Sequence, residues 1–318
     1  VVGTSIGDHA NVRSVSGNIT LSTRQNAGLS SGYGARAYSS SSAGGLLAGS
    51  GADADATLTL DLDTTVGNGA TLNAAGTIRL ETIADNFANA DGAGKAIGLG
   101  GVGVSFADAD VGGSVNTLVG SSSATAGTDL VLSSDLHGDA YAESDAASGG
   151  ILGGGQVNRA VAAYNPTLNV EVNAAPSMHA GRDITLENLS EADVTADANG
   201  TSIQVAGLAI GGSAADATNR PLMNTWLDAA QAGMVSASRN LSLSARHNDD
   251  GSGHIAGRNA EATANSSAGG ALSGNGCAAL TYAVADFLAQ NAASPAAVEL
   301  PDGQAEAAGH EDNEADEE

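Results

Sequence analysis

A short motif recurs along the chain, and this repetition constrains the fold more than any other feature of the sequence. Its copies follow the pattern Ala-Gly-x-x-(Ile/Leu)-x-Leu with small variations, at intervals of about 55 residues. The anchors of the five copies are Gly17, Gly76, Gly127, Gly181 and Ser238. A Gly-Gly pair follows each anchor, at positions 44–45, 100–101, 149–150, 211–212 and 269–270. Repeats of this kind predict a stack of similar units in which each unit packs on its neighbours.

Within the repeats, apolar and polar residues alternate as they do in β-strands. The clearest stretch is 52–63, where even positions hold Ala or Leu and odd positions hold Asp or Thr. This period gives a strand one apolar face and one polar face. Two segments, 222–231 and 280–290, also fit a helix, but they lie where the other copies carry strands. We therefore predict strands in both.

The apolar residues of the chain are mostly small, which limits the kind of core they can build. Aromatic residues make up only 3% of the sequence, and 44 of its 318 residues are glycine. Stability must then come from repetition and backbone hydrogen bonds, because burying Ala gains far less than burying Leu or Phe. We predict an all-β fold, a parallel β-solenoid (β-helix) built from about five 55-residue repeats. At about 20–30 residues per coil, ten coils spaced by about 4.8 Å would form a thin rod on the order of 50 Å long.

The sequence predicts two regions. Residues 1–290 form the repetitive β-solenoid stalk, and residues 291–318 form an acidic disordered tail. The tail combines low hydrophobicity with charge of one sign, since residues 299–318 contain no Lys or Arg. The chain begins in mid-pattern at Val1, from which we expect a piece of a longer array.

The charge balance excludes several classes of partner. Eleven Lys and Arg stand against 36 Asp and Glu, which gives a formal charge of −25. No basic face exists to neutralise phosphates, so we expect no nucleic-acid binding. The sequence contains no run of 18 apolar residues, so it predicts no membrane span. Cys277 is the only cysteine, which excludes an internal disulfide, and we expect it to be a small buried residue.

Candidate metal sites are few. His247 and His254 flank an Asn-Asp-Asp-Gly segment, which is either a cation loop or, as we expect, a solvated loop. Asp53, Asp55, Asp61 and Asp63 share one strand face, and neither the nine-residue calcium repeat nor the EF-hand pattern is present. We interpret that face as solvated acid that opposes aggregation. No metal and no other cofactor is therefore predicted, and Ca²⁺ bridging of stacked carboxylates is the alternative.

No catalytic constellation stands out. The sequence has no phosphate-binding Gly-Lys-Ser/Thr loop and no Gly-x-Ser-x-Gly elbow, so we predict no enzyme and no catalytic residues. The alternative is a β-helical polysaccharide lyase or hydrolase, for which Glu187 and Glu191 offer one carboxylate pair. A further hypothesis is an ice or mineral binder with hydroxyl rows, although Thr57 and Thr59 form the only Thr-x-Thr of that kind.

The recurring Ala-Gly-x-x-(Ile/Leu)-x-Leu strands, Ala-x-Ala alternation and Gly-Gly turns resemble a known family over residues 1–290. They are similar to the filamentous-haemagglutinin-like adhesins, large repetitive exoproteins of Gram-negative bacteria, and especially to the leukotoxin-family filamentous adhesins. The resemblance implies a β-helical stalk that is exported through the outer membrane and is secreted or displayed on the bacterial cell surface. It also implies a role in cell adhesion and virulence, with a surface receptor or polysaccharide of a host or the environment as partner.

Overall fold

The computed structural model describes residues 1–28, 33–173, 177–228, 235–249, 252, 259–284 and 286–291. The described chain is all β, and every pairing between its strands is parallel, as the sequence predicts. The strands are β1 Val2–Ile6, β2 Asn11–Ser14, β3 Ile19–Gln25, β4 Tyr33–Val66, β5 Thr71–Ala74, β6 Ile78–Val119, β7 Ser123–Ala126, β8 Leu130–Val172, β9 Ser177–Ala180, β10 Asp183–Gln204, β11 Leu208–Asn219, β12 Leu222–Leu227, β13 Val235–Ala237, β14 Asn240–His247, β15 Ala260–Gly269, β16 Leu272–Ala283 and β17 Asp286–Asn291. The strand predictions for 222–231 and 280–290 are confirmed by β12, β16 and β17 in the described parts of those segments.

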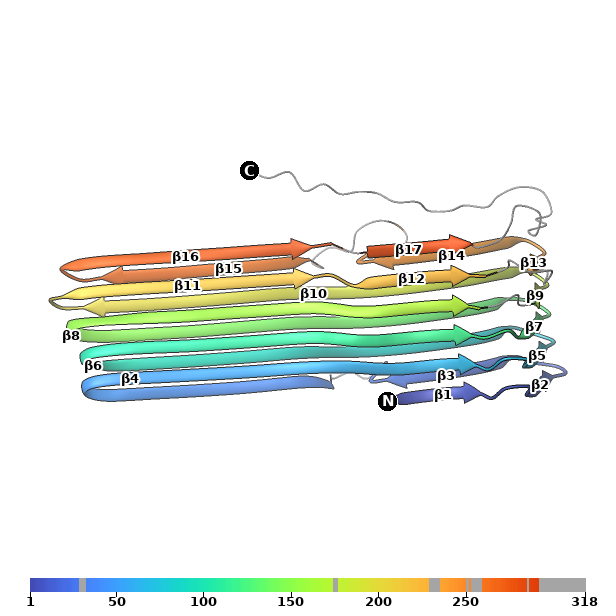
Figure 1. The fold of residues 1–318 in the computed structure, drawn as a ribbon, viewed down its shortest axis with the longest axis horizontal. Coiled ribbons are helices and arrows are strands. Elements are labelled where there is room, and N and C mark those ends of the chain that lie inside the picture. Colours follow the sequence, from blue (N-terminus) through green and yellow to red (C-terminus); the bar gives the residue numbers. More distant parts are fainter. Residues whose placement is uncertain are drawn as a thin grey trace.

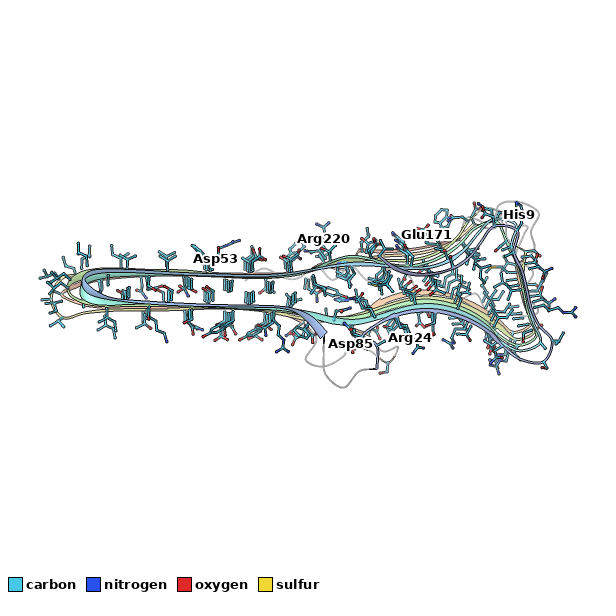
Figure 2. The ribbon with its side chains drawn as sticks, turned by 90° about the horizontal axis from the view of Figure 1, so that it is seen from below. His9, Arg24, Asp53, Asp85, Glu171 and Arg220 are labelled. Carbon is cyan, nitrogen blue, oxygen red and sulfur yellow. The ribbon has the colours of Figure 1, made fainter. Side chains whose placement is uncertain are left out.

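Each coil of the chain has two parts, a three-sided head and a flat blade (Figures 1 and 2). The head contains β2, β5, β7, β9 and β13, which form a separate five-stranded sheet, together with the neighbouring short strands and the ends of the long ones. From the head, the chain runs along one arm of the blade, turns at the far end and returns along the other arm. We call that far end the tip; it comprises residues 44–49, 97–102, 149–155, 203–210 and 269–274.

One repeat makes one coil. Ile78 pairs with Leu130, and Leu130 pairs with Ile184, so each copy of the motif lies directly on the next. The prediction of two coils per repeat, and of a ten-coil rod, is therefore wrong. The two blade arms lengthen each coil without widening its core. The described stack is only about 20–25 Å high at 4.8 Å per coil, and the longest dimension runs along the strands (Figure 1).

The two glycine signals of the repeat have different structural meanings. The anchor glycines stack on one another, since Gly76 N–H donates to Gly17 O at 3.0 Å and a Cβ on Gly181 would lie 2.2 Å from Gly127 O. The Gly-Gly pairs do not stack. Gly149, for example, pairs with Ile97 and Ile203 in the adjacent coils. The anchors therefore mark the register of the coils, whereas the Gly-Gly pairs only lie in or near the tip.

The alternation of the sequence places small residues inside the blade and larger ones inside the head. Ala54, Ala56, Leu60 and Leu62 are buried, as the pattern of 52–63 predicts. The core of the blade consists mainly of alanines, whereas the core of the head is richer in Leu, Ile and Val. The blade is therefore thin, because facing sheets approach closely when mostly methyl groups lie between them.

Buried hydroxyl and amide groups separate the two cores and tie the facing sheets together. Thr82 Oγ1 donates to Asn116 O at 2.7 Å, and Thr117 Oγ1 donates to Ser133 O at 2.8 Å. Ser134 Oγ donates to Asn169 O at 2.9 Å one coil further on. We call this band the polar waist. It fixes the distance between the sheets at the point where the wide head becomes the narrow blade.

Two predictions concern the C-terminal part of the chain. Cys277 is exposed, not buried, because it lies on β16, the last described strand of its arm, where no further coil covers it. Ser213, its partner on β11, is buried. Of the tail predicted at 291–318, Asn291 ends β17, and the remainder lies outside the described residues.

No membrane-spanning helix is found among the residues that the structure describes.

Candidate functional site

The outer face of the sheet beside the head contains a charged hollow that we call the acidic groove. Its volume is about 270 Å³, and β6, β8 and β10 line it with outward side chains at alternate positions. The register brings Glu81, Ser133 and Glu187 into one column, because each is the third residue after the first apolar residue of its motif. Arg79 and Asp135 complete the charged lining. Figure 2 shows that this sheet bows inward near Arg24, so these side chains face a concave surface.

Arginines hold two of the carboxylates in the groove. Arg24 Nη2 donates to Glu81 Oε1 at 2.6 Å, and Arg79 Nη1 lies 3.6 Å from Glu81 Oε2. Burial of Glu81 tends to raise its pKa, but hydrogen bonds from Arg24 and Ser22 and the charges of both arginines outweigh burial and lower it. Arg246 forms an ion pair with Glu187 in the same way. Both glutamates therefore form ion pairs with arginines of a neighbouring strand.

Asp135 differs from these glutamates because no arginine pairs with it among the described residues. Burial raises its pKa, and the repulsion of Glu191, Glu187 and Glu81 adds to this effect, which His137 offsets only in part. His137 Nε2 lies 3.8 Å from Asp135 Oδ1 and 3.5 Å from Glu191 Oε1. An acid with a raised pKa beside an imidazole and a second carboxylate has the components of a proton-transfer group.

The structure separates the carboxylate pair that the sequence suggests. Glu187 lies in the acidic groove, whereas Glu191 lies further along β10 beside His137. Asp135 and His137 were not among the residues singled out in the sequence. They come from β8, one coil away, and only the coil register brings them beside β10. Counting five and seven residues from the first apolar residue of the motif would have found them.

A larger cavity of about 590 Å³ lies at the edge of the head, but it offers less chemistry. Its lining comes from strand ends and turns of successive coils, including Ile6, Val66 and Val119. The one carboxylate in the lining, Asp8, accepts a hydrogen bond from Asn68 N–H at 2.7 Å. This carboxylate therefore closes a turn of the backbone.

The acidic face predicted on 52–63 points outward from the blade (Figure 2). Asp53, Asp55 and Asp61 are exposed, whereas Asp63 accepts a hydrogen bond from Asn116 Nδ2 at 2.8 Å. Asn169 and Asn224 continue this column as an asparagine ladder, each amide donating to the side-chain oxygen of the previous one at 2.7 and 2.9 Å. In the described part of the chain, no three His, Cys, Asp or Glu residues are grouped as metal ligands.

Carboxylates of neighbouring coils crowd one another on both arms of the blade. Burial raises the pKa of Asp108 and of Asp110, and the charge of Asp55 adds to both shifts. On the other arm, burial and the charge of Glu143 raise the pKa of Asp145. At neutral pH these carboxylates therefore repel their acidic neighbours, and the fold holds them close together.

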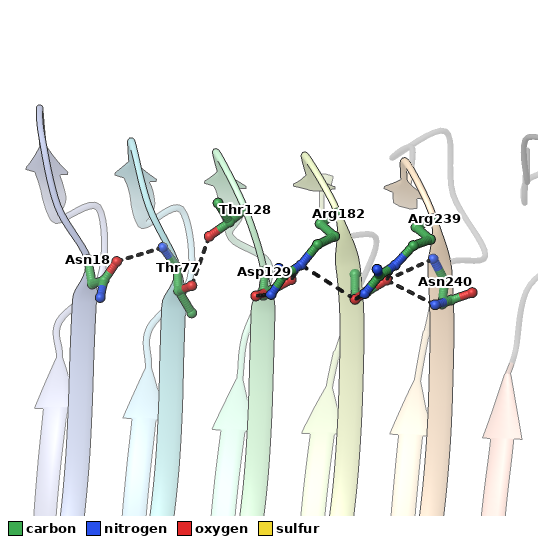
Figure 3. A network of polar contacts seen from close by, with 8 residues as sticks. Asn18, Thr77, Thr128, Asp129, Arg182, Arg239 and Asn240 are labelled. Atoms are coloured by element: carbon green, nitrogen blue, oxygen red, sulfur yellow. Dashed lines mark hydrogen bonds and ion pairs between the residues drawn. The ribbon is translucent and has the colours of Figure 1, made fainter.

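A second ladder of polar side chains lies between the anchors and the strands that follow them (Figure 3). Arg182 Nε donates to Asp129 Oδ1 at 2.7 Å, and Arg239 Nε donates to Asp183 Oδ1 at 2.9 Å, each across one coil. In the earlier coils, Thr77 N–H donates to Asn18 Oδ1 at 2.9 Å. The arginines lower the pKa of Asp129 and Asp183. This ladder ties successive coils together at the bend beside the anchors.

The predicted histidine loop is only partly described. His247 Nδ1 lies 3.1 Å from Ser190 Oγ, and its ring stacks on Tyr164 with 6.2 Å between centroids. Asn248 Oδ1 accepts from Ala192 N–H at 2.8 Å, and its Nδ2 donates to Ala192 O at 3.1 Å. These two residues fasten the loop to β10. His254 lies outside the described residues, as do positions 250–251.

The hydroxyl row of the ice-binder hypothesis does not continue across the coils. Thr57 pairs in register with Asp110, and Thr59 pairs with Gly112. Thr57 Oγ1 also donates to Asp55 Oδ1 at 3.0 Å. A flat array of threonines therefore does not form on this face of the blade.

Searches of protein-family models, of curated proteins and of solved structures found no match to this chain.

Proposed function

We propose that the chain is a structural stalk segment of a large secreted or surface-displayed bacterial adhesin, and that it acts in attachment without catalysis. In this proposal the parallel sheets form a β-solenoid of about five 55-residue repeats with one coil per repeat. The observation that carries the proposal is the pairing of each coil with the next along its length, as between β6 and β8 from Ile78↔Leu130 to Val119↔Val172, with one register shift at the tip between Gly98 and Gly100. The resemblance to filamentous-haemagglutinin-like adhesins supports the same conclusion.

The side chains are arranged as a load-bearing scaffold requires. Polar ladders connect neighbouring coils at two places, through Asp63 and Asn116 on the sheet face and through Asp129 and Arg182 at the bend. The acidic faces of the blade oppose association of separate molecules through those faces, because like charges repel. The partner in attachment would be a receptor or polysaccharide on a host or environmental surface.

Attachment is tested with beads that carry the full chain at a fixed density. We expect the coated beads to adhere to epithelial cells or to polysaccharide films more than beads that carry an unrelated acidic protein. Ala142→Asp places a charge in the blade core, where Ala142 is fully buried, and should abolish adhesion by disrupting the coils. Asp53→Asn, at an exposed position, is the matched control that should leave it intact. Adhesion no greater than that of the unrelated protein on every surface would refute the proposal.

The cluster of Asp135, His137 and Glu191 favours one second candidate, a polysaccharide lyase or hydrolase. The raised pKa of Asp135 is the specific observation, because a protonated carboxyl beside a carboxylate is the usual requirement for glycoside cleavage. The test measures new reducing ends and unsaturated sugars from a panel of acidic and neutral polysaccharides. Turnover that Asp135→Asn abolishes and Asp53→Asn preserves would establish this candidate, and no turnover on any of them would exclude it.

A further inference from the structure

The tip of the blade carries a continuous strip of exposed aliphatic side chains. Every described coil contributes at least one, and their exposed fractions range from about half to nearly nine tenths. The members are Leu46, Leu47, Ile97, Val102, Ile151, Leu152, Ile203, Val205, Leu208, Ile210 and Leu272. We call this strip the tip ridge. It presents on the order of 1,000 Å², more than the 300–600 Å² of the largest apolar patch on a typical monomer.

The tip ridge is uncharged on a molecule whose formal charge is −25. None of the five tip segments, 44–49, 97–102, 149–155, 203–210 and 269–274, contains a charged residue. Acidic residues begin further along each arm. The first are Asp53 and Asp55 on one arm, and Asp145 and Asp197 on the other. The basic residue nearest in sequence to a tip segment is Lys95. An apolar centre with a polar rim is the usual composition of a protein interface.

Two columns of the tip ridge alternate glycine with a β-branched residue from coil to coil. On one arm the strand register stacks Gly44, Ile97, Gly149, Ile203 and Gly269. On the other arm it stacks Gly49, Val102, Gly155, Ile210 and Gly274. Each column therefore presents a projecting side chain on every second coil, about 10 Å apart, with a gap between them.

The monomer does not require the glycines in these gaps. A Cβ on Gly49, Gly269 or Gly274 would meet nothing within 4 Å, and one on Gly149 would lie 3.9 Å from the nearest atom. Inward glycines differ, since a Cβ on Gly103 would lie 2.4 Å from Ala147 O. Glycine weakens a strand interior, and an unforced glycine in a strand often marks a bulge, a bend, or a place where a ligand or another backbone approaches closely.

We propose that the tip ridge binds a second copy of this chain, tip against tip, in a dimer whose two-fold axis is perpendicular to the stack. A displacement by one coil then places Ile97 and Ile203 of one copy into glycine gaps of the other, and the contact is reciprocal. The ridge supplies the area, because a standard interface takes about 800 Å² from each partner. Tip-to-tip contact also leaves the acidic arms pointing away from each other. This inference does not depend on the proposed role in adhesion.

Sedimentation equilibrium of the full chain over a wide concentration range tests the dimer. We expect a monomer–dimer equilibrium that strengthens with salt, because salt screens the acidic rims. Filling the gaps with Gly149→Leu and Gly155→Leu should weaken dimerisation by about tenfold or more, and so should removing the projections with Ile97→Ser and Ile203→Ser. Far-ultraviolet circular dichroism checks that each variant remains folded.

Two control variants lie away from the tip. Gly112→Leu adds a side chain where a Cβ would also meet nothing within 4 Å, and Val15→Ser removes an aliphatic residue that is 74% exposed in the head. Both should dimerise as the unmodified chain does. A chain that stays monomeric at all concentrations, or a dimer that the tip variants leave unchanged, would overturn the proposal. Flotation of a monomeric chain with neutral phosphatidylcholine vesicles, lost in the Ile97→Ser and Ile203→Ser variant, would assign the tip ridge to a lipid surface instead.

Discussion

At the scale of single residues, close packing decides which positions tolerate a side chain. Tyr164 is the largest fully buried side chain among the residues that the structure describes, and its hydroxyl lies 2.8 Å from Ser190 Oγ. Gly138 faces it, and a Cβ there would lie 2.5 Å from Tyr164 Cε2. The core of the blade is mainly alanine, and the bulky ring of Tyr164 fits there because Gly138 has no side chain. Composition alone predicts a core of small residues, but it does not predict this exception.

Gly138→Ala should therefore destabilise the fold by about 1–3 kcal/mol, the usual cost of overpacking a core. Gly149→Ala on the same strand is the control, because its Cβ would lie in ordinary contact and should stabilise the strand by up to about 1 kcal/mol. Urea unfolding followed by circular dichroism gives both free energies. Equal effects of the two substitutions would contradict the packing argument.

At the scale of elements, the sequence predicts the strands well and their partners poorly. Alternation such as that in 52–63 is a local signal, and the buried and exposed faces follow from it directly. The strand that pairs with a given arm comes one full coil later in the sequence, as Leu130 does after Ile78. No local feature of the sequence indicates the length of a coil. The acidic groove was missed for the same reason, since Glu81, Asp135 and Glu187 come from three different coils.

The polar waist makes a testable contribution at this scale. Thr117 is fully buried and donates to Ser133 O at 2.8 Å, and its hydroxyl lies 3.2 Å from Ser134 Oγ. Thr117→Val should cost about 1–3 kcal/mol of unfolding free energy, because it leaves buried polar groups unpaired. Thr57→Val, on an exposed outward position, should change the unfolding free energy by less than about 0.5 kcal/mol. If both variants unfold at the same urea concentration, the waist hydrogen bonds do not stabilise the fold.

At the scale of the whole molecule, the acidic surface sets how stability depends on pH. Asp108, Asp110 and Asp145 have raised pKa values, chiefly through burial and with the charges of neighbouring carboxylates adding to it. A carboxyl whose pKa is higher in the folded state binds a proton more readily when folded. Its effect on stability is therefore unfavourable above the folded pKa and is relieved as the pH falls through it.

The melting temperature should therefore rise as the pH is lowered from 7 through the raised pKa values of these carboxyls, which is opposite to the usual behaviour of salt-bridged carboxylates. Below about pH 4 it should fall again, because Glu81, whose pKa is lowered, then loses its ion pairs. Thermal unfolding followed by circular dichroism across this range measures the effect. The variant Asp108→Asn with Asp110→Asn should melt higher at pH 7 and show a flatter rise, and an unchanged pH profile would contradict this account.

The equality of one repeat and one coil has a consequence for how such a chain can change over generations. Recombination that duplicates or deletes a single copy in the gene adds or removes one whole coil, about 4.8 Å of the stack, and leaves the same hydrogen-bonding edge. The alternation of glycine with a β-branched residue at the tip has a period of two coils. Such events therefore conserve its spacing only when copies are gained or lost in pairs.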